Sequence, residues 1–340
     1  WKNRFGSMAN PQTLNDSQIG VIVACIYVHP LIGDMRASVR RQADLAERFV
    51  KENPGWVLAR SGSEALQAFK SGKRVMILAL EGASGMLETE ADLDEFIGKR
   101  GIRIVNLLHL TDDHFGGVAF LRGIMGLASP IAWLRSLFDS NRENGVKRNT
   151  RGLTSEGEAL AKNLISRHVW IDLAHASDEA QKRLVALHRD AGLPLLYTHT
   201  ALRKYLGAER GISNSQLQDL AQTGGFMGFM PSPDMLVDTP PWKEGCTGGI
   251  QRLARQYSEA AKVVGGDAIG LGTDYSGGIP HLEPPSDGCK TGTSLDEKGF
   301  WNISQARDVW KALAAAQVGT PRRLGASAER FLHAWARVNP

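Results

Sequence analysis

Three absences narrow the function of this sequence before any motif is considered. No apolar stretch approaches the roughly 18 residues that a membrane-spanning helix needs, and no signal peptide is visible. No run of five or more basic residues occurs, although 40 basic and 36 acidic residues leave a net charge of +4. We therefore expect no transmembrane segment and no nucleic-acid partner.

Cysteine is scarce as well: the chain has three, and none forms the C-x-x-C pair of a thiolate zinc site. Cys25 lies in an apolar run and is predicted to be a buried thiol. Cys246 and Cys289 lie in loops rich in Gly and Pro, which are compatible either with a disulfide or with two free thiols. A disulfide would need an oxidising compartment. Together with a chain that begins without Met at Trp1, it favours an exported or periplasmic protein over a cytoplasmic one.

Strand and helix patterns alternate along the chain, and an apolar content of 42% allows a sizeable core. Seven runs, most of them continuously apolar like parallel strands buried on both faces, are predicted strands: 20–27, 75–80, 102–108, 168–173, 195–198, 225–229 and 268–272. Between them lie helix patterns at 35–51, 64–70, 91–99, 154–166, 178–191, 213–223 and 249–264. The alternation predicts an α/β fold, a (β/α)8 TIM-type barrel made by residues 1–340 as a single domain.

A barrel of this type needs an eighth strand, which should precede residue 20. Residues 1–19 are polar and make a poor strand, and a barrel with one strand missing would have an open edge. We therefore expect the first strand in residues upstream of Trp1. Two segments interrupt the alternation: residues 115–152 are predicted to form an elaborated loop with one or two helices, and residues 275–296 a Gly/Pro-rich loop.

Residue types that bind metals end three of the predicted strands. Glu81, His175 and His199 each follow an apolar run. The carboxyl ends of barrel strands converge on one mouth, and one carboxylate with two imidazoles is a donor set for a hydrolytic zinc site. Each residue taken alone is compatible with a structural role, such as an ion pair between Glu81 and an arginine. Their coincidence at strand ends favours a metal site.

Other polar residues follow the predicted strands. His109 is a candidate to polarise a carbonyl oxygen, Asp274 to shuttle a proton, and Arg210 to hold a substrate carboxylate through two hydrogen bonds. A loop histidine, a turn-capping aspartate and a solvated arginine are the structural alternatives. Asp172 is a candidate partner for a metal-binding histidine, and His114 is predicted to lie on the surface.

Five short blocks then occur in a recognisable order. They read LALEG at 78–82, GIR with LLH at 101–109, GLTSEG with IDLAHAS at 152–177, THT with RGIS at 198–213, and GLGTDYSG at 270–277. From about residue 20 to residue 332, the chain resembles the membrane (renal-type) dipeptidases, peptidase family M19, within the amidohydrolase-like metal barrels.

The resemblance implies a role for each candidate residue. Glu81 would bridge two zinc ions, of which one would be completed by His175 and His199. His109 would hold and polarise the scissile carbonyl, and Arg210 would bind the C-terminal carboxylate of the substrate. Asp274 would receive the substrate amine or shuttle the proton during attack by metal-activated water. The resemblance also implies a homodimer.

The sequence departs from the family pattern in two places. The family's first strand carries an H-x-D pair that holds the first zinc, and no such pair precedes Glu81 here, where the only histidine is His29. We expect the pair upstream of Trp1; the alternative is that the first zinc site is absent. Residues 110–117, LTDDHFGG, replace an Asn-containing segment that borders the substrate, which leaves dipeptide specificity open.

The sequence therefore predicts a zinc-dependent dipeptidase that takes a dipeptide or similar small molecule. One alternative is the same chemistry on another small amide, such as a lactam or a modified amino-acid conjugate. A second is a barrel that has lost one metal site and only binds a ligand. Under the first alternative, replacing Arg210 by alanine should barely change substrate binding. Under the second, no H-x-D pair should lie upstream of Trp1.

Overall fold

The computed structural model describes residues 8–29, 33–120, 138, 140–237, 249–276, 280, 282–285, 289–315 and 325–340. The chain divides into two compact units. The first unit comprises the described parts of residues 20–196, 208–210 and 331–340. The second unit comprises those of residues 1–19, 197–207 and 211–330. Among the described residues, no helix is both long and apolar enough to cross a membrane.

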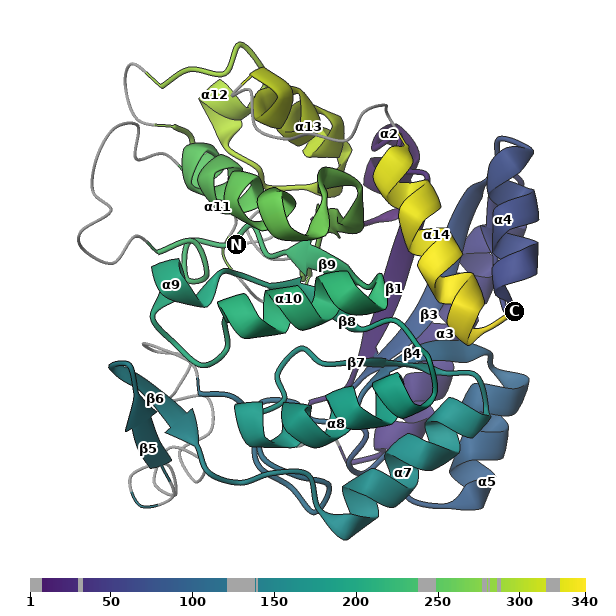
Figure 1. The fold of residues 1–340 in the computed structure, drawn as a ribbon. Helices are drawn as coiled ribbons and strands as arrows, with labels where there is room; N and C mark the ends of the chain where they lie inside the picture. The colour runs from purple at the N-terminus through teal and green to yellow at the C-terminus, as the bar shows by residue number, and fades with distance from the viewer. Residues whose placement is uncertain are drawn as a thin grey trace. The chain divides into compact units, whose positions relative to one another are not determined.

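Parallel strands form the centre of the first unit (Figure 1). Their order is β1 (Val21–Tyr27), β3 (Arg74–Glu81), β4 (Ile102–Asn106) and β7 (Trp170–Asp172). The short strand β2 (Trp56–Leu58) pairs with the start of β3, and β4 pairs with the remainder of β3. Residues 75–81 of β3 are all buried, as expected for a parallel strand covered on both faces.

Helices of the first unit begin at polar side chains that accept a backbone N–H of the first turn, the usual N-cap arrangement. The caps are Asp34, Ser61, Thr154 and Ser177. The capped helices are α3 (Met35–Glu52), α4 (Gly62–Lys70), α7 (Ser155–Ser166) and α8 (Asp178–Asp190). Thr89 caps α5 (Glu90–Leu93), which continues directly into a π-helix at Asp94–Lys99. Helix α14 (Ala326–Val338) belongs to this unit from residue 331 onward.

Strand β8 (Leu196–Thr200) begins in the first unit and continues in the second, where β9 (Phe226–Phe229) and β10 (Ile269–Leu271) pair in parallel. The helices of the second unit are α2 (Pro11–Asp16), α9 (Arg203–Leu206), α10 (Asn214–Thr223), α11 (Gly249–Val264), α12 (Leu295–Lys298) and α13 (Ala306–Ala315). Two short 3-10 turns cover Gly266–Ala268 and Ile303–Gln305.

Glycine allows these strands to approach closely. A Cβ atom at Gly228 or at Gly272 would lie 2.2 Å from the carbonyl oxygen of Thr198, which no side chain tolerates. Gly228 of β9 and Gly272, which directly follows β10, therefore allow the backbone to pack against Thr198, the residue before His199.

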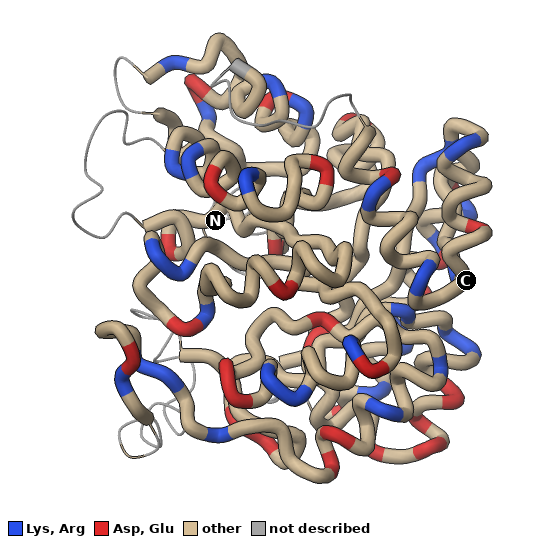
Figure 2. The backbone as a smooth tube through the Cα atoms, viewed as in Figure 1, with Lys and Arg blue, Asp and Glu red and all other residues tan. Residues whose placement is uncertain are grey.

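All seven predicted strands are present, which confirms the α/β class. The three-residue β2 was not predicted. In the segment 115–152, residues 121–137 and 139 lie outside the described residues, so the helices expected there are not tested. Its polar end, predicted as loop, is an antiparallel hairpin of β5 (Ser140–Glu143) and β6 (Val146–Asn149). Figure 2 shows basic and acidic residues interspersed along the backbone.

The prediction that Cys25 is buried was wrong, because its side chain is exposed. In the described part of the chain, β1 pairs with β3 alone and so lies at one end of the strand order. The apolar composition of this run gives no sign of the exposure of Cys25. Cys289 is buried and disulfide-bonded, whereas Cys246 lies outside the described residues.

Candidate metal centre

Glu81 is the last residue of β3 and is only 6% exposed. Gly82 follows with a φ of +84°, a value that glycine adopts without strain, and turns the chain away from the strand. The Gly82 N–H donates to the carbonyl oxygen of Asn106 at 3.0 Å, which ties the end of β3 to the end of β4. The Glu81 carboxylate therefore projects from a fixed strand end.

His175 lies three residues beyond the end of β7 and has a φ of +67°, which is uncommon outside glycine. Hydrogen bonds hold this turn on both sides. Asp172 accepts the Ala174 N–H at 3.0 Å, and the His175 carbonyl oxygen accepts the Ala119 N–H at 2.7 Å. The turn places His175 Nε2 3.2 Å from Glu81 Oε1.

Asp172 was predicted as a possible partner of a metal-binding histidine. Asp172 accepts the backbone N–H of Ala174 at 3.0 Å and, at 3.5 Å, a side-chain N–H of Asn106. The Asn106 amide also donates to the Ala174 carbonyl oxygen. Asp172 and Asn106 thus shape the turn that carries His175.

His109 follows β4 and also approaches the carboxylate, with Nε2 3.6 Å from Glu81 Oε1. Its ring meets that of His175 edge to face, with centroids 4.5 Å apart, and that of Tyr27 at 4.9 Å. A Cβ atom at Gly82 would lie 3.4 Å from the His109 Cβ, an ordinary van der Waals contact, so the positive φ of Gly82 is what favours glycine there.

Burial favours the neutral form of both imidazoles. Burial lowers the pKa of His175 well below its ordinary value of 6.5, and the positive charge of Arg210 and the neighbouring His109 lower it further. Burial also lowers the pKa of His109; Arg210 lowers it as well, whereas the Glu81 carboxylate opposes that shift. A neutral imidazole keeps a nitrogen lone pair that can bind a metal ion.

His199 lies on β8 and is 7% exposed, and its Nδ1 is 2.9 Å from the Thr198 hydroxyl. One donor atom from each of Glu81, His175 and His199 lies within 4.8 Å of the others. The structure therefore brings together the three residues predicted as metal ligands. Their chemistry, one carboxylate oxygen and two imidazole nitrogens, fits a catalytic zinc ion, which takes three protein ligands.

Arg210 is 4% exposed, and its backbone N–H donates to the Phe120 carbonyl oxygen at 3.2 Å. The solvated alternative for this residue was therefore wrong. Asp274 follows β10 in the second unit, is half-buried, and has a φ of +51°. His114 is exposed, as predicted, and its Nε2 lies 2.9 Å from Glu88.

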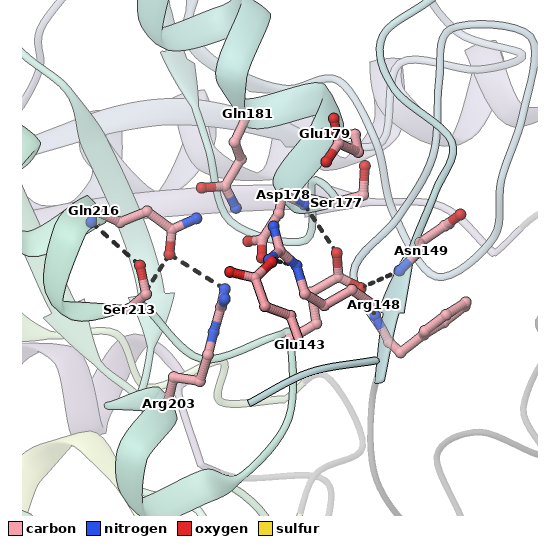
Figure 3. Close-up of polar contacts among 12 residues, drawn as sticks. Glu143, Arg148, Asn149, Ser177, Asp178, Glu179, Gln181, Arg203, Ser213 and Gln216 are labelled. Atoms are coloured by element: carbon pink, nitrogen blue, oxygen red, sulfur yellow. Dashed lines mark hydrogen bonds and ion pairs between the residues drawn. The ribbon is translucent and has the colours of Figure 1, made fainter. Parts of the chain in front are cut away.

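Glu209, which sequence reasoning missed, holds the segment beside Arg210 in place. Its buried carboxylate accepts three backbone N–H groups, from Phe120 at 3.0 Å and from Asn149 and Asp178 at 2.9 Å each. Figure 3 shows Arg148, Asn149 and Asp178 close together. Arg148 Nε lies 2.7 Å from the Asp178 carboxylate. No periodic pattern in the loop sequence indicated a buried carboxylate.

Burial raises the pKa of Glu209 to about 7, although its three backbone donors oppose the shift. A carboxyl group with a raised folded-state pKa contributes stability that is complete below its unfolded pKa and is lost as pH rises through the folded value. The free energy of unfolding of the wild type should therefore fall, relative to that of Glu209→Gln, between pH 4.5 and about 7. Urea unfolding at several pH values measures this difference, and parallel pH profiles of the two proteins would contradict it.

Comparison with known proteins matches these features to one family. The family model described as membrane dipeptidase (peptidase family M19) matches residues 130–312, more than half of the chain. The dipeptidase ataJ of Aspergillus terreus is 23% identical over 240 residues, covering 70% of this chain and 55% of that protein. The matched part thus spans about half the length of this curated relative.

Solved structures show the same fold. A metallo peptidase from Rhodobacter sphaeroides, liganded with a phosphinate mimic of the dipeptide L-Ala-D-Ala, is 17% identical with a TM-score of 0.71, over 97% of this chain and 90% of that one. The probable dipeptidase PvdM from Pseudomonas aeruginosa is 16% identical with a TM-score of 0.70, over 97% and 88%. This likeness confirms the predicted barrel-type α/β fold.

Proposed function

Because the chain belongs to the membrane dipeptidase family, peptidase family M19, we propose that it is a zinc-dependent hydrolase that cleaves the amide bond of dipeptides. The cluster of Glu81, His175 and His199 carries this proposal. Glu81 is the last residue of β3, and His199 is the last but one of β8. Both are buried at the carboxyl ends of their strands, where barrel enzymes place their chemistry. A zinc ion held there would polarise the scissile carbonyl and activate water at neutral pH.

The protein's own residues would orient the substrate around that centre. Burial lowers the pKa of His109, which favours its neutral form, and we assign its ring N–H to hold the carbonyl oxygen of the scissile amide. The Arg210 guanidinium offers paired donors that match a carboxylate, and we assign it to the C-terminal carboxylate of the substrate. We assign the proton transfer to the leaving amine to Asp274.

Two zinc ions are part of the proposal, and Glu81 would be a ligand of both. His175 and His199 would hold one ion. The H-x-D pair for the other stays a prediction, as do the homodimer and export from the cytoplasm.

Metal analysis and turnover on the full-length protein test the proposal together. We expect zinc to co-purify and a panel of dipeptides, with L-Ala-D-Ala among them, to be hydrolysed with loss of activity on chelation and recovery on adding zinc. A protein that carries the H-x-D segment and yet neither binds zinc nor hydrolyses any dipeptide would refute it. Hydrolysis confined to lactams or amino-acid conjugates would instead favour the same chemistry on another small amide.

A further inference from the structure

Glu209 and Arg210 are both hydrogen-bonded to Phe120. The Glu209 carboxylate accepts the Phe120 N–H at 3.0 Å through Oε2, and the Phe120 carbonyl oxygen accepts the Arg210 N–H at 3.2 Å. Two consecutive residues of the loop after α9 therefore bind both backbone groups of one residue. This pair of bonds fixes the direction of the backbone at Arg210 as well as its distance from Phe120.

The same carboxylate reaches two further segments of the first unit. Oε2 also accepts the N–H of Asn149, the last residue of β6, and Oε1 accepts the N–H of Asp178, the first residue of α8. Glu209 is only 1% exposed, so the loss of these bonds would leave buried N–H groups with no partner, which is costly. One side chain thus holds three segments, distant in sequence, around residues 209 and 210.

The Arg210 guanidinium lies close enough to the metal centre to act on it. Its positive charge lowers the pKa of both His109 and His175, and the influence of a charge weakens with distance. A guanidinium that binds a carboxylate through two parallel hydrogen bonds must be held at the correct distance and angle. That orientation depends on the backbone from which the side chain extends, which is the backbone that Glu209 holds.

We propose that Glu209 is a positioning residue for substrate recognition: it fixes the backbone from which Arg210 binds the C-terminal carboxylate of the substrate. The inference rests on the proposed dipeptidase function and assigns Glu209 a role that is exerted through Arg210. A misplacement of about 1 Å in a group that positions the substrate can cost about 100-fold in activity. Weaker hydrogen bonding at Glu209 should therefore raise KM for dipeptides with a free carboxylate.

Two variants remove these hydrogen bonds by different amounts. Glu209→Gln keeps an amide oxygen for Phe120 and Asn149 but turns an NH2 group toward the Asp178 N–H. It should raise KM for L-Ala-D-Ala about 3- to 10-fold, as expected for the loss of one hydrogen bond. Glu209→Leu removes all three acceptors in a similar volume and should raise KM further, toward about 100-fold. In both variants kcat and zinc content should change little.

A double-mutant cycle with Arg210 separates positioning from a general structural role. If Glu209 acts through Arg210, Glu209→Gln should cost nothing further in an Arg210→Ala background. It should also cost nothing on the C-terminal amide of L-Ala-D-Ala, which has no carboxylate to bind. A residue with only a structural role would lower kcat/KM by the same factor in both backgrounds and on both substrates.

Asp92→Asn is the matched control for these variants. Asp92 is another buried carboxylate of the first unit, and it accepts the backbone N–H groups of Glu88 at 3.1 Å and Thr89 at 3.0 Å. Its substitution removes a comparable buried acceptor at a distance in sequence from Arg210. KM for L-Ala-D-Ala should stay at the wild-type value in this variant.

Three results would each overturn the role of Glu209 while leaving the proposed function standing. They are an unchanged KM in Glu209→Gln, equal losses on the free and the amidated dipeptide, and a loss that persists in Arg210→Ala. If circular dichroism shows that Glu209→Leu does not fold, the Glu209→Gln measurements decide the question alone. A full-length wild type that hydrolyses no dipeptide would overturn the proposed function and the role of Glu209 with it.

Discussion

Glu81→Gln is expected to abolish zinc binding and amide hydrolysis together. Glutamine keeps the size of the side chain but removes the negative charge and one of the two oxygens that face neighbouring donors, His175 on one side and Cys25 on the other. Loss of a group that merely supports a metal ligand already costs about 10–100-fold in metal affinity or activity. Removing a shared ligand should exceed about 100-fold in both quantities.

A matched control shows whether the loss of zinc and activity is specific to Glu81 or follows from removing any carboxylate beside a histidine. Glu88 lies 2.9 Å from His114 at the surface of the same unit. Glu88→Gln should therefore keep zinc content and turnover near the wild-type level. Zinc content is measured by elemental analysis after dialysis, and folding by circular dichroism. A Glu81→Gln protein that retains zinc and activity would remove Glu81 from the metal centre.

Arg210→Ala is expected to weaken the use of dipeptides through lost binding of the substrate carboxylate. Removing one partner of a buried, hydrogen-bonded charge pair costs about 2–5 kcal/mol, which corresponds to a loss of about 30-fold or more in kcat/KM. Because Arg210 also lowers the pKa of His109 and His175, its loss changes the charge around the metal centre as well.

The substrate supplies the control for this variant. A dipeptide with an amidated C-terminus lacks the carboxylate, so the wild type should hydrolyse it poorly and Arg210→Ala should hydrolyse it about as well as the wild type does. Comparing kcat/KM for the acid and the amide in both proteins gives the coupling between the guanidinium and the carboxylate. If Arg210→Ala lost the same factor on both substrates, Arg210 would act on the structure or the metal centre, not on the carboxylate.

The strands and the cluster of Glu81, His175 and His199 were predictable because each leaves a local mark in the sequence. A strand buried on both faces must be continuously apolar, as residues 75–80 are, so a glutamate or histidine at its end is conspicuous. The carboxyl ends of parallel strands meet at one edge, so Glu81 and His175 could be placed together before any coordinates. Short elements such as β2 and the β5–β6 hairpin leave too few residues for such a pattern.

Tertiary structure decided what depends on neighbours distant in sequence. The apolar run around Cys25 gives no sign that, among the described residues, the thiol is exposed and lies 3.9 Å from Glu81 Oε2. Glu209 looks like any loop glutamate until three backbone N–H groups from separate segments converge on it. By itself the sequence determined which strands form and which glutamate and histidine residues follow them, because hydrophobic periodicity is local. The exposure of Cys25 and the burial of Glu209 are sums over distant parts of the chain, so only the folded structure decided them.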